Sequence, residues 1–282
     1  MSFITRFAPS PTGPLHLGHA YSAMLAHDMA RAVGGTFLLR IEDIDRSRAR
    51  PEWEVQIYDD LHWLGLDWPQ PVMRQSDRMD RYAQALAQLS AQGLTYPCRC
   101  RRGDIEAAAG APQEGVPRFG PDGRIYPGTC RGRSMAEAGE DDVIRLDMEK
   151  ATGALPALSF TETGAAQAGV HRLDRDHLIG AVGDIVLVRR QMGSSYHLSV
   201  VVDDADQGIT HVVRGLDLFE ATQIHVLLQH LLGLPVPVYH HHRLIRDDQG
   251  KRLAKRDDAR AIAKYRAEGA TPEDVRRMVE LG

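Results

Sequence analysis

The sequence has few cysteines, few aromatic residues and little net charge. Three of its 282 residues are cysteine, all between Cys98 and Cys130, and 6% are aromatic. An odd number of thiols in one segment argues against an extracellular disulfide framework. The formal net charge of -4 argues against a chain that coats nucleic acid indiscriminately, but it is compatible with a specific RNA contact through a local basic face.

Targeting and membrane-spanning signals are also missing from the sequence. The N-terminal MSFITRF lacks the basic start, apolar stretch and small-residue cleavage site of a secretory signal. No uninterrupted apolar run is long enough to cross a bilayer. We therefore expect a cytoplasmic protein without a membrane partner, and a monomer by default.

Strand-like and helix-like stretches alternate along most of the chain. The expected strands span residues 3–7, 36–41, 184–189, 196–202, 208–213 and 238–245, and the expected helices span 17–33, 53–64, 80–92 and 218–232. This alternation predicts a doubly wound α/β domain with a mainly parallel sheet, followed by a short helical tail after Lys255. Because ligands bind at the carboxyl ends of such strands, the loop after Phe7 and the residue Glu42 should lie on one rim.

The motif His16-Leu-Gly-His19 opens the first expected helix. A helix N-terminus presents unpaired N–H groups and a positive dipole, which suit a phosphate or a developing negative charge. The two imidazoles share one helical face and add donors, and Gly18 lets a flat nucleotide approach the backbone. Taken alone, the motif is also compatible with two partly exposed histidines beside a cap, or with a pair of metal ligands.

The residues around this motif carry a family resemblance. RFAPSPTGPLHLGHA, residues 6–20, resembles the first signature of class I aminoacyl-tRNA synthetases in their glutamyl and glutaminyl form. Later blocks match in the same order, namely FLLRIED at 37–43, VVDD at 201–204, GITHVVRG at 208–215 and KRLAK at 251–255. Several blocks in register are more specific than any one of them. The resemblance implies a Rossmann-type catalytic domain that activates L-glutamate with ATP.

The resemblance also implies a set of residues that hold L-glutamate. Glu42 would meet its ammonium group, and Arg214 would pair a carboxylate in a bidentate fork. A salt bridge between Glu42 and Arg214 at the rim is the competing interpretation. The residues implied for glutamate are Arg6, Phe7, Ala8, Pro9, Ser10, Glu42, Tyr196 and Arg214.

A second implied set serves ATP, which would enter with Mg²⁺. It consists of His16, Gly18, His19 and Lys255, and the two histidines and the lysine are the implied catalytic residues. In-line attack of the glutamate carboxylate on the α-phosphate, with loss of pyrophosphate, needs positioning and charge stabilisation rather than a covalent nucleophile. The last block departs from the family at Arg252 and Ala254, where a lysine and a serine are usual. Lys255 keeps the charge, whereas loop dynamics and nucleotide affinity stay open.

Periodicity breaks down between residues 97 and 139, a stretch rich in Gly, Pro and Arg that we interpret as an irregular insertion. It is longer than an ordinary loop, so it needs a stabiliser or a function. Its C-x-C…Y-x-x-x-C pattern resembles the zinc site of the glutamyl-Q tRNA(Asp) synthetases, short relatives of glutamyl-tRNA synthetase, and implies one structural Zn²⁺. Three reduced cysteines without metal are the alternative, because phenolate is an unusual ligand. The candidate ligands are Cys98, Cys100, Tyr126 and Cys130.

The expected domains are a catalytic domain at 1–245 and an ATP-binding loop with a short helical remnant at 246–282. A full glutamyl-tRNA synthetase continues into a domain that reads the anticodon, for which we expect no room here. With the insertion, this resembles the glutamyl-Q tRNA(Asp) synthetases, which activate glutamate without tRNA and transfer it to the queuosine base of tRNA(Asp). Another acceptor, or an inactive synthetase-derived RNA-binding module, is the alternative.

Two further clusters are open to more than one interpretation. His240-His-His242 lie in a strand-like run, and we interpret them as core or surface histidines rather than ligands. The basic cluster of Arg46, Arg48 and Arg50 is about equally compatible with a contact to a tRNA backbone and with a solvated face.

Overall fold

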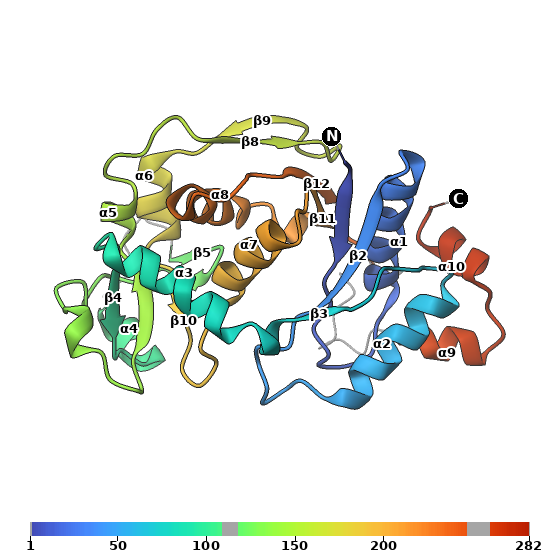
Figure 1. Cartoon of the computed structure of the whole chain (residues 1–282), viewed down its shortest axis with the longest axis horizontal. Coiled ribbons are helices and arrows are strands. Elements are labelled where there is room, and N and C mark those ends of the chain that lie inside the picture. Colours follow the sequence, from blue (N-terminus) through green and yellow to red (C-terminus); the bar gives the residue numbers. More distant parts are fainter. Residues whose placement is uncertain (1, 109–117, 247–259, 282) are drawn as a thin grey trace.

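The chain folds around a parallel sheet covered by helices, to which a smaller antiparallel sheet is attached (Figure 1). The structure is a computed structural model and describes residues 2–108, 118–246 and 260–281. The described strands are β1 (Ile4–Phe7), β2 (Thr36–Ile41), β3 (Met73–Arg74), β4 (Thr95–Cys98), β5 (Phe119–Gly120), β6 (Gly123–Arg124), β7 (Val143–Leu146), β8 (Ser159–Glu162), β9 (Gly169–Arg172), β10 (Val186–Val188), β11 (His211–Gly215) and β12 (Val238–His242).

Ten helices and four shorter helical turns are described. The helices are α1 (Leu17–Ala32), α2 (Pro51–Trp63), α3 (Met79–Ala91), α4 (Arg102–Ala108), α5 (Met148–Ala151), α6 (Arg175–His177), α7 (Tyr196–Asp206), α8 (Thr222–Leu232), α9 (Ile262–Ala267) and α10 (Pro272–Met278). The shorter turns are η1 (Gln75–Asp77), η2 (Met135–Glu137), η3 (Leu178–Val182) and η4 (Leu216–Leu218). Within the described ranges, no helix combines the length and the apolar character that spanning a membrane requires.

The parallel sheet is wound in two directions from β1. Strands β1, β2 and β3 pair in parallel on one side. On the other side β11, β12 and β8 pair in parallel, and β9 adds an antiparallel edge. The backbone N–H of Thr210 donates to the carbonyl of Ile4 at 2.9 Å, which places the start of β11 beside β1. The doubly wound, Rossmann-type fold is therefore confirmed, and its winding reverses between β1 and β11.

Strand β2 shows how an apolar run in the sequence covers both faces of the sheet. Phe37, Leu39 and Ile41 are buried in the apolar cluster that contains α1 and α2. Leu38 packs instead against the cluster that contains Val226 of α8. Successive strand residues point to opposite faces, so an apolar run of this kind predicts a strand buried on both sides. The strand has the expected bounds.

Helix α1 begins and ends close to the expected residues because both ends carry local signals. His16 is its N-cap residue, and the side chains of His16 and His19 form a capping box with the backbone. Beyond the C-terminus Gly34 has a φ of +64°, a conformation that costs glycine nothing. Helices α2, α3 and α8 lie within a few residues of their expected bounds.

The strand expected at 196–202 is wrong, because these residues form most of α7. The helix is buried on all sides from His197 to Asp204, so its sequence carries no helical period that would distinguish it from a buried strand. Three consecutive valines, 200–202, favour a strand by local preference. The signal for a helix is at its start, where Ser195 Oγ accepts the N–H of Leu198 at 3.4 Å.

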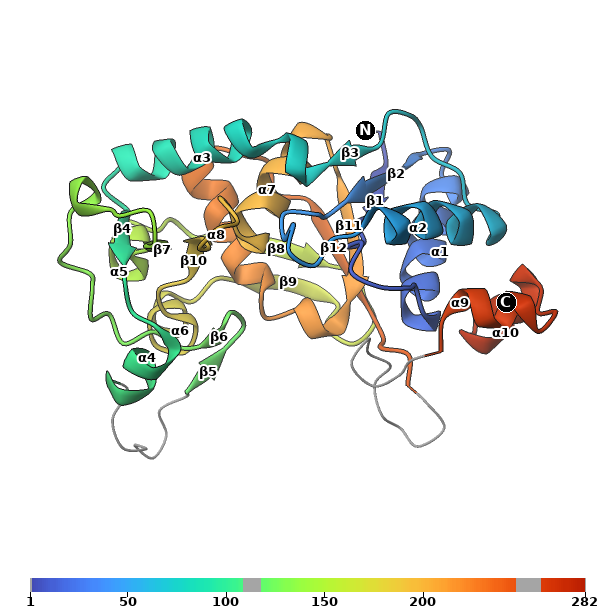
Figure 2. The same ribbon diagram turned by 90° about the horizontal axis from the view of Figure 1, so that it is seen from below.

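The stretch 97–139, expected to be irregular, connects two strands of the second, antiparallel sheet. It begins at the end of β4 and returns at β7, and these strands pair antiparallel from Thr95–Leu146 to Cys98–Val143. Between them the described residues form α4 and a hairpin of β5 and β6. The strand expected at 184–189 exists as β10, but it pairs antiparallel with β7 and belongs to this second sheet. Figure 2 shows this region at one end of the molecule, with α9 and α10 at the other.

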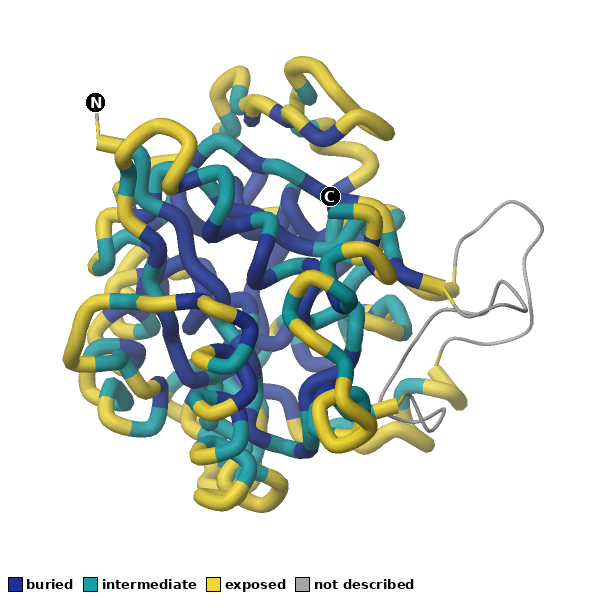
Figure 3. Tube along the Cα trace, turned by 90° about the vertical axis from the view of Figure 1, so that its right-hand side faces the viewer, coloured by how far each residue is buried: buried dark blue, intermediate teal, exposed yellow. Residues whose placement is uncertain are grey.

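Two aspartates near the end of α7 fasten this helix to the parallel sheet and to α3. Asp204, 5% exposed, accepts hydrogen bonds from Arg6 of β1 at 2.9 and 3.1 Å and from Arg40 of β2 at 2.7 Å. Asp203 is fully buried and accepts from the hydroxyl of Tyr82 and from Arg78. Buried segments such as these run through the interior in Figure 3, and exposed loops surround them.

We predict that Asp204→Asn destabilises the fold by about 3–5 kcal/mol, because two buried guanidinium groups would lose their counter-charge. Burial opposes ionisation of Asp204, but Arg6 and Arg40 outweigh it and lower the pKa of this carboxyl. Its stabilising effect is therefore complete above the ordinary aspartate pKa and is lost as the pH falls through the lowered value. Urea unfolding of the wild type and of Asp204→Asn at neutral pH measures the difference in the free energy of unfolding.

The matched control is Asp206→Asn on the same helix. Asp206 also pairs with arginines, Arg78 and Arg81, but its side chain is 28% exposed. We expect a loss below about 1 kcal/mol for this change. Equal losses for the two substitutions would contradict the importance assigned to the buried pair.

Candidate active site

A cavity of about 540 Å³ opens where the winding of the parallel sheet reverses. It is lined by the ends of β1 and β11, by residues just after β2 and β12, and by the start of α1. The loop after Phe7 and the residue Glu42 thus share one rim, as expected from the strand order, and the N–H of Glu42 donates to the carbonyl of Pro9 at 3.0 Å. The residues predicted for the site that line this cavity are Arg6, Phe7, Ala8, Ser10, His16, Gly18, His19, Glu42, Tyr196 and Arg214.

The cavity also has lining residues that the sequence analysis missed. They are Ser22, Val213, Gly215, Asp217, Leu218, His242, Arg243, Leu244 and Ile245. Most of them lie at or just beyond the carboxyl ends of β11 and β12. Since ligands bind at these strand ends, their position in the fold is the signal that could have identified them. Of the three successive histidines, His242 lines the cavity and His241 is buried beside it.

The rings of His16 and His19 lie against each other at the start of α1, with centroids 3.8 Å apart and planes tilted by 37°. Nδ1 of His16 accepts the N–H of Gly18 at 3.1 Å, and Nδ1 of His19 accepts the N–H of His16 at 3.1 Å. Because each Nδ1 is an acceptor, the proton of each neutral ring lies on Nε2 and makes that atom a donor. The helix start therefore presents imidazole donors together with its own dipole.

Glu42 lies at the end of a chain of buried charges. Arg40 is fully buried and donates to Glu42 at 3.1 Å and to Asp204 at 2.7 Å. Burial raises the pKa of Glu42, although Arg40 and Arg6 oppose the rise. Arg6, which lines the cavity, is held by Asp204 through Nε and Nη2. Arg40 and Asp204 lie in the matching blocks 37–43 and 201–204, but neither of them was assigned a role from the sequence.

Tyr196 of α7 and Arg214 of β11 line the cavity. Arg214 is 6% exposed and donates to Thr222, His225 and His241. Burial raises the pKa of Tyr196, which keeps its phenol protonated. The rim salt bridge between Glu42 and Arg214 is not formed, since the described partner of Glu42 is Arg40.

Lys255 lies outside the described residues, as do Arg252 and Ala254. The described residues on either side of this segment approach the cavity. Ile245 lines it, and Ala261 forms a bridge with His16.

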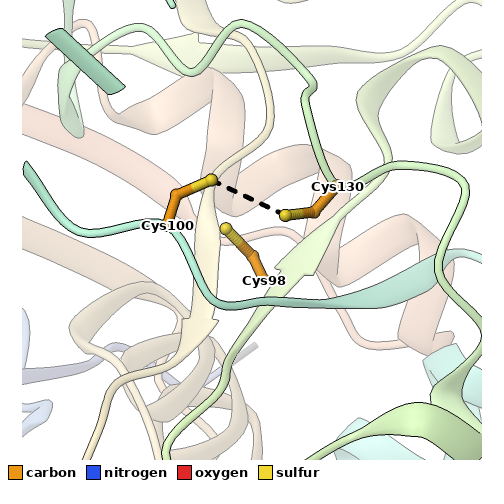
Figure 4. Close-up of side chains that lie close together, drawn as sticks. All are labelled: Cys98, Cys100 and Cys130. Carbon is orange, nitrogen blue, oxygen red and sulfur yellow. Dashed lines mark hydrogen bonds between the residues drawn. The ribbon is translucent and has the colours of Figure 1, made fainter. Parts of the chain in front are cut away.

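Three thiols come together between β4 and the segment before β7 (Figure 4). The Sγ atoms of Cys98, Cys100 and Cys130 all lie within 4.8 Å of one another, and those of Cys100 and Cys130 are 3.6 Å apart. The hydroxyl of Tyr126 lies 3.4 Å from Cys100 Sγ. Sulfurs bound to one tetrahedral zinc at about 2.3 Å are about 3.8 Å apart. The spacing and the soft donors fit a metal of this kind.

The basic cluster of Arg46, Arg48 and Arg50 is engaged with the protein's own backbone at two of its three positions. Arg46 donates to the carbonyl of Ser76, and Arg50 donates to the carbonyls of Ser47 and Ala49. These exposed contacts favour a solvated face and leave a phosphate contact compatible with the structure.

With the fold and cavity described, comparison with known proteins defines the class. A family model described as tRNA synthetases class I (E and Q), catalytic domain, matches residues 2–282. The chain belongs to this family of class I tRNA synthetases. A solved glutamate-tRNA synthetase from Elizabethkingia anophelis superposes with a TM-score of 0.74 at 27% identity. The match covers 97% of this chain and 60% of that one, so the chain spans about three-fifths of its length.

Within the family, the chain is most informatively compared with shorter relatives. It is 64% identical over 281 residues to the Glutamyl-Q tRNA(Asp) synthetase of Rhodobacter capsulatus, covering 99% of this chain and 100% of the relative. It is 43% identical over 280 residues to the protein of the same name from Symbiobacterium thermophilum, covering 96% and 83%. The recognition of this group from the motifs is therefore confirmed.

Proposed function

We propose that this enzyme activates L-glutamate with ATP in the absence of tRNA and transfers it to the queuosine base of tRNA(Asp). The observation that carries the proposal is one cavity that holds an anionic residue, Glu42, and an arginine, Arg214, beside the imidazole donors of α1. A free amino acid with an extra carboxylate carries the complementary charges.

In this proposal the cavity fixes glutamate by its charges. Glu42 accepts from the ammonium group, and Arg214 donates to a carboxylate, with Tyr196 alongside. Arg6 and Phe7 at the end of β1, with Ala8 and Ser10 in the loop that follows, shape the wall, and Pro9 between them holds the N–H of Glu42 through its carbonyl. Glu42 and Arg214 are held by contacts within the protein, so little rearrangement is needed on binding.

ATP in this proposal binds over the start of α1. A glutamate carboxylate oxygen forms a bond to the α-phosphorus, the bond to the bridging oxygen breaks, and pyrophosphate leaves with the electron pair. His16 and His19 donate from Nε2 to phosphate oxygens as negative charge develops. Gly18 admits the nucleotide, and Lys255 and Mg²⁺ supply further positive charge, as the resemblance implies.

The proposed acceptor is supported by the names of the relatives and not by the cavity. The Rhodobacter relative is named for tRNA(Asp) and is covered over its whole length. We further infer that residues 1–245 form the catalytic domain and 246–282 an ATP-binding loop with a helical remnant. In the remnant, α10 is tied to α1 by the pair of Arg276 and Asp28.

The proposal predicts glutamate-dependent exchange of pyrophosphate into ATP with no RNA added, because the groups assigned to glutamate and ATP all belong to this chain. Transfer of labelled glutamate should then require tRNA(Asp) that carries queuosine. The control is the same tRNA from cells that lack queuosine. Absence of exchange would support the inactive RNA-binding module, and exchange with equal labelling of both tRNAs would support another acceptor.

Gly18→Ala is predicted to impair the ATP step without unfolding the protein. A Cβ at Gly18 would lie 3.1 Å from Cε1 and 3.2 Å from Nδ1 of His16, so the imidazole must shift by a few tenths of an ångström. We expect exchange to fall on the order of tenfold, since small displacements of positioning groups reduce rates steeply. Helix stability should stay equal or rise, because alanine favours helix.

The matched control for this prediction is Gly103→Ala in α4. There a Cβ would meet no atom within 4 Å, so exchange should be unchanged. An equal effect of the two substitutions, or none at Gly18, would contradict the role given to the His16 imidazole.

We also propose that Cys98, Cys100, Cys130 and Tyr126 hold one structural zinc ion that fixes the residues between β4 and β7. The tyrosine is 3% exposed, and the guanidinium of Arg145 stacks on its ring at 3.9 Å. Cys98, Tyr126 and Cys130 form a separate buried cluster with Tyr96, and the partly buried Cys100 packs against it. A metal there would stabilise a segment that has little apolar core of its own.

Metal analysis of purified protein should find about one zinc per chain, as a single structural site requires. Cys98→Ser and Cys130→Ser should each abolish it and lower the unfolding temperature. Tyr126→Phe keeps the ring over Arg145 and removes only the oxygen, so it tests the phenol as a ligand. Wild-type protein without zinc would refute the site, and full zinc retention in Tyr126→Phe would limit it to the thiols.

A further inference from the structure

Arg214 is a buried cation that no carboxylate of the described chain neutralises. No aspartate or glutamate oxygen among the described residues forms an ion pair with it, although it is only 6% exposed. Arg6 and Arg40, the other buried arginines near the cavity, are both paired with Asp204. An unpaired buried charge is costly, so it is retained where a ligand supplies the opposite charge.

The acceptors around Arg214 are neutral groups. Its Nε donates to His241 Nε2 at 3.0 Å, its Nη1 to His225 Nδ1 at 2.9 Å, and its Nη2 to Thr222 Oγ1 at 2.7 Å. Burial and the nearby guanidinium lower the pKa of His225 well below its usual value and that of His241 to about 4. Both rings are therefore uncharged at neutral pH and orient the guanidinium without cancelling its charge.

Each of these two rings is oriented from behind. Because His241 accepts through Nε2, its proton lies on Nδ1, which donates to the buried carboxylate of Glu162 at 2.5 Å. Glu162 is fixed in turn by the N–H groups of His241 and Gly164. This branch runs within the parallel sheet, from β11 through β12 to β8.

The second branch leaves the parallel sheet. His225 accepts from Arg214 through Nδ1, so its Nε2–H donates to Nδ1 of His197 at 3.1 Å. The remaining nitrogen of His197, Nε2, lies 3.3 Å from Oδ1 of Asp122. Asp122 stands in the turn between β5 and β6, in the insertion that also carries the three thiols. A series of hydrogen bonds, each donated in the direction from Arg214 toward Asp122, thus connects Arg214 to the insertion.

We propose that His225, His197 and Asp122 act as positioning residues for Arg214, so that the insertion helps to set the affinity of the cavity for the substrate carboxylate. This inference rests on the proposed function, since it takes glutamate as the ligand. Asp122 lies beside Nε2 of His197 and so fixes the proton of this ring on Nε2. Nδ1 of His197 then accepts from His225 and fixes the proton of that ring on its own Nε2. These hydrogen bonds keep a neutral nitrogen facing Arg214, so that the positive charge of the guanidinium stays available to the substrate carboxylate.

The charge argument is tested with an isosteric pair, His225→Asn and His225→Asp. Both substitutions place an oxygen near the position of Nδ1 and leave the same space behind it. Asparagine keeps a neutral acceptor, whereas aspartate pairs with Arg214 and competes with the substrate carboxylate. We expect glutamate binding, measured directly by calorimetry, to be weaker in His225→Asp than in His225→Asn by on the order of a hundredfold.

The connection to the insertion is tested with Asp122→Ala. We expect the Kd and the KM for glutamate to rise about tenfold, with the KM for ATP unchanged, because only the amino-acid end of the cavity is affected. In a His225→Asn background the same change should add nothing, since the chain is already interrupted. Asp176→Ala, whose carboxylate is 92% exposed on α6, is the control and should change neither value.

The outcomes separate the inference from the function on which it rests. Wild-type protein that binds no glutamate would overturn both. Wild-type binding with equal affinities in His225→Asn and His225→Asp, or with additive effects of Asp122→Ala and His225→Asn, would overturn the inference alone. If a substitution at His225 prevents folding, Asp122→Ala is compared with Arg189→Ala, because Asp122 also accepts from Arg189 and from the N–H of Val186. A selective rise of the glutamate KM in Asp122→Ala but not in Arg189→Ala supports the inference, and equal effects of the two substitutions would overturn it.

Discussion

The carboxylate of Asp204 is the contact on which the rest of the site depends, because two strands and a helix meet at it. Arg6 comes from β1, Arg40 from β2, and Asp204 from the helix that leads into β11. Arg40 then reaches Glu42, so the position of the acidic rim residue is transmitted through the same charge. Burying these groups is favourable only as a complete set, since any one removed leaves an uncompensated charge.

On the opposite side of the cavity, an arginine has a different electrostatic environment. Arg6 and Arg40 are neutralised within the protein and serve the architecture, whereas Arg214 is surrounded by neutral nitrogens and oxygens. The difference lies in the acceptors and not in burial, which is similar for all three. Among the described residues, the cavity thus presents an arginine that has no carboxylate partner and a carboxylate, Glu42, that is paired with Arg40. This arrangement suits a zwitterion with an additional acid group.

Much of this architecture could be predicted because the signals are local. The apolar run of β2 and the glycines after α1 determine those elements, and the strand order then brings Phe7 and Glu42 to one rim. Helix α7 could not be predicted, because burial on every side removes the helical period and consecutive valines favour a strand. The partner of β10 could not be predicted either, since it depends on contacts formed only in the folded chain.

Motif comparison matches short blocks and assigns roles within them to residues that touch a ligand, but it assigns none to the residues that orient those ligand contacts. Asp122 and Glu162 belong to no such block, yet each ends a hydrogen-bond branch that begins at Arg214. Their role follows from the donor-to-acceptor direction of each hydrogen bond. That direction is defined only when the tautomer of each histidine is assigned from its neighbour. The insertion is therefore connected to the cavity by directed hydrogen bonds as well as by the backbone. A metal that fixes the insertion would act through the same hydrogen bonds.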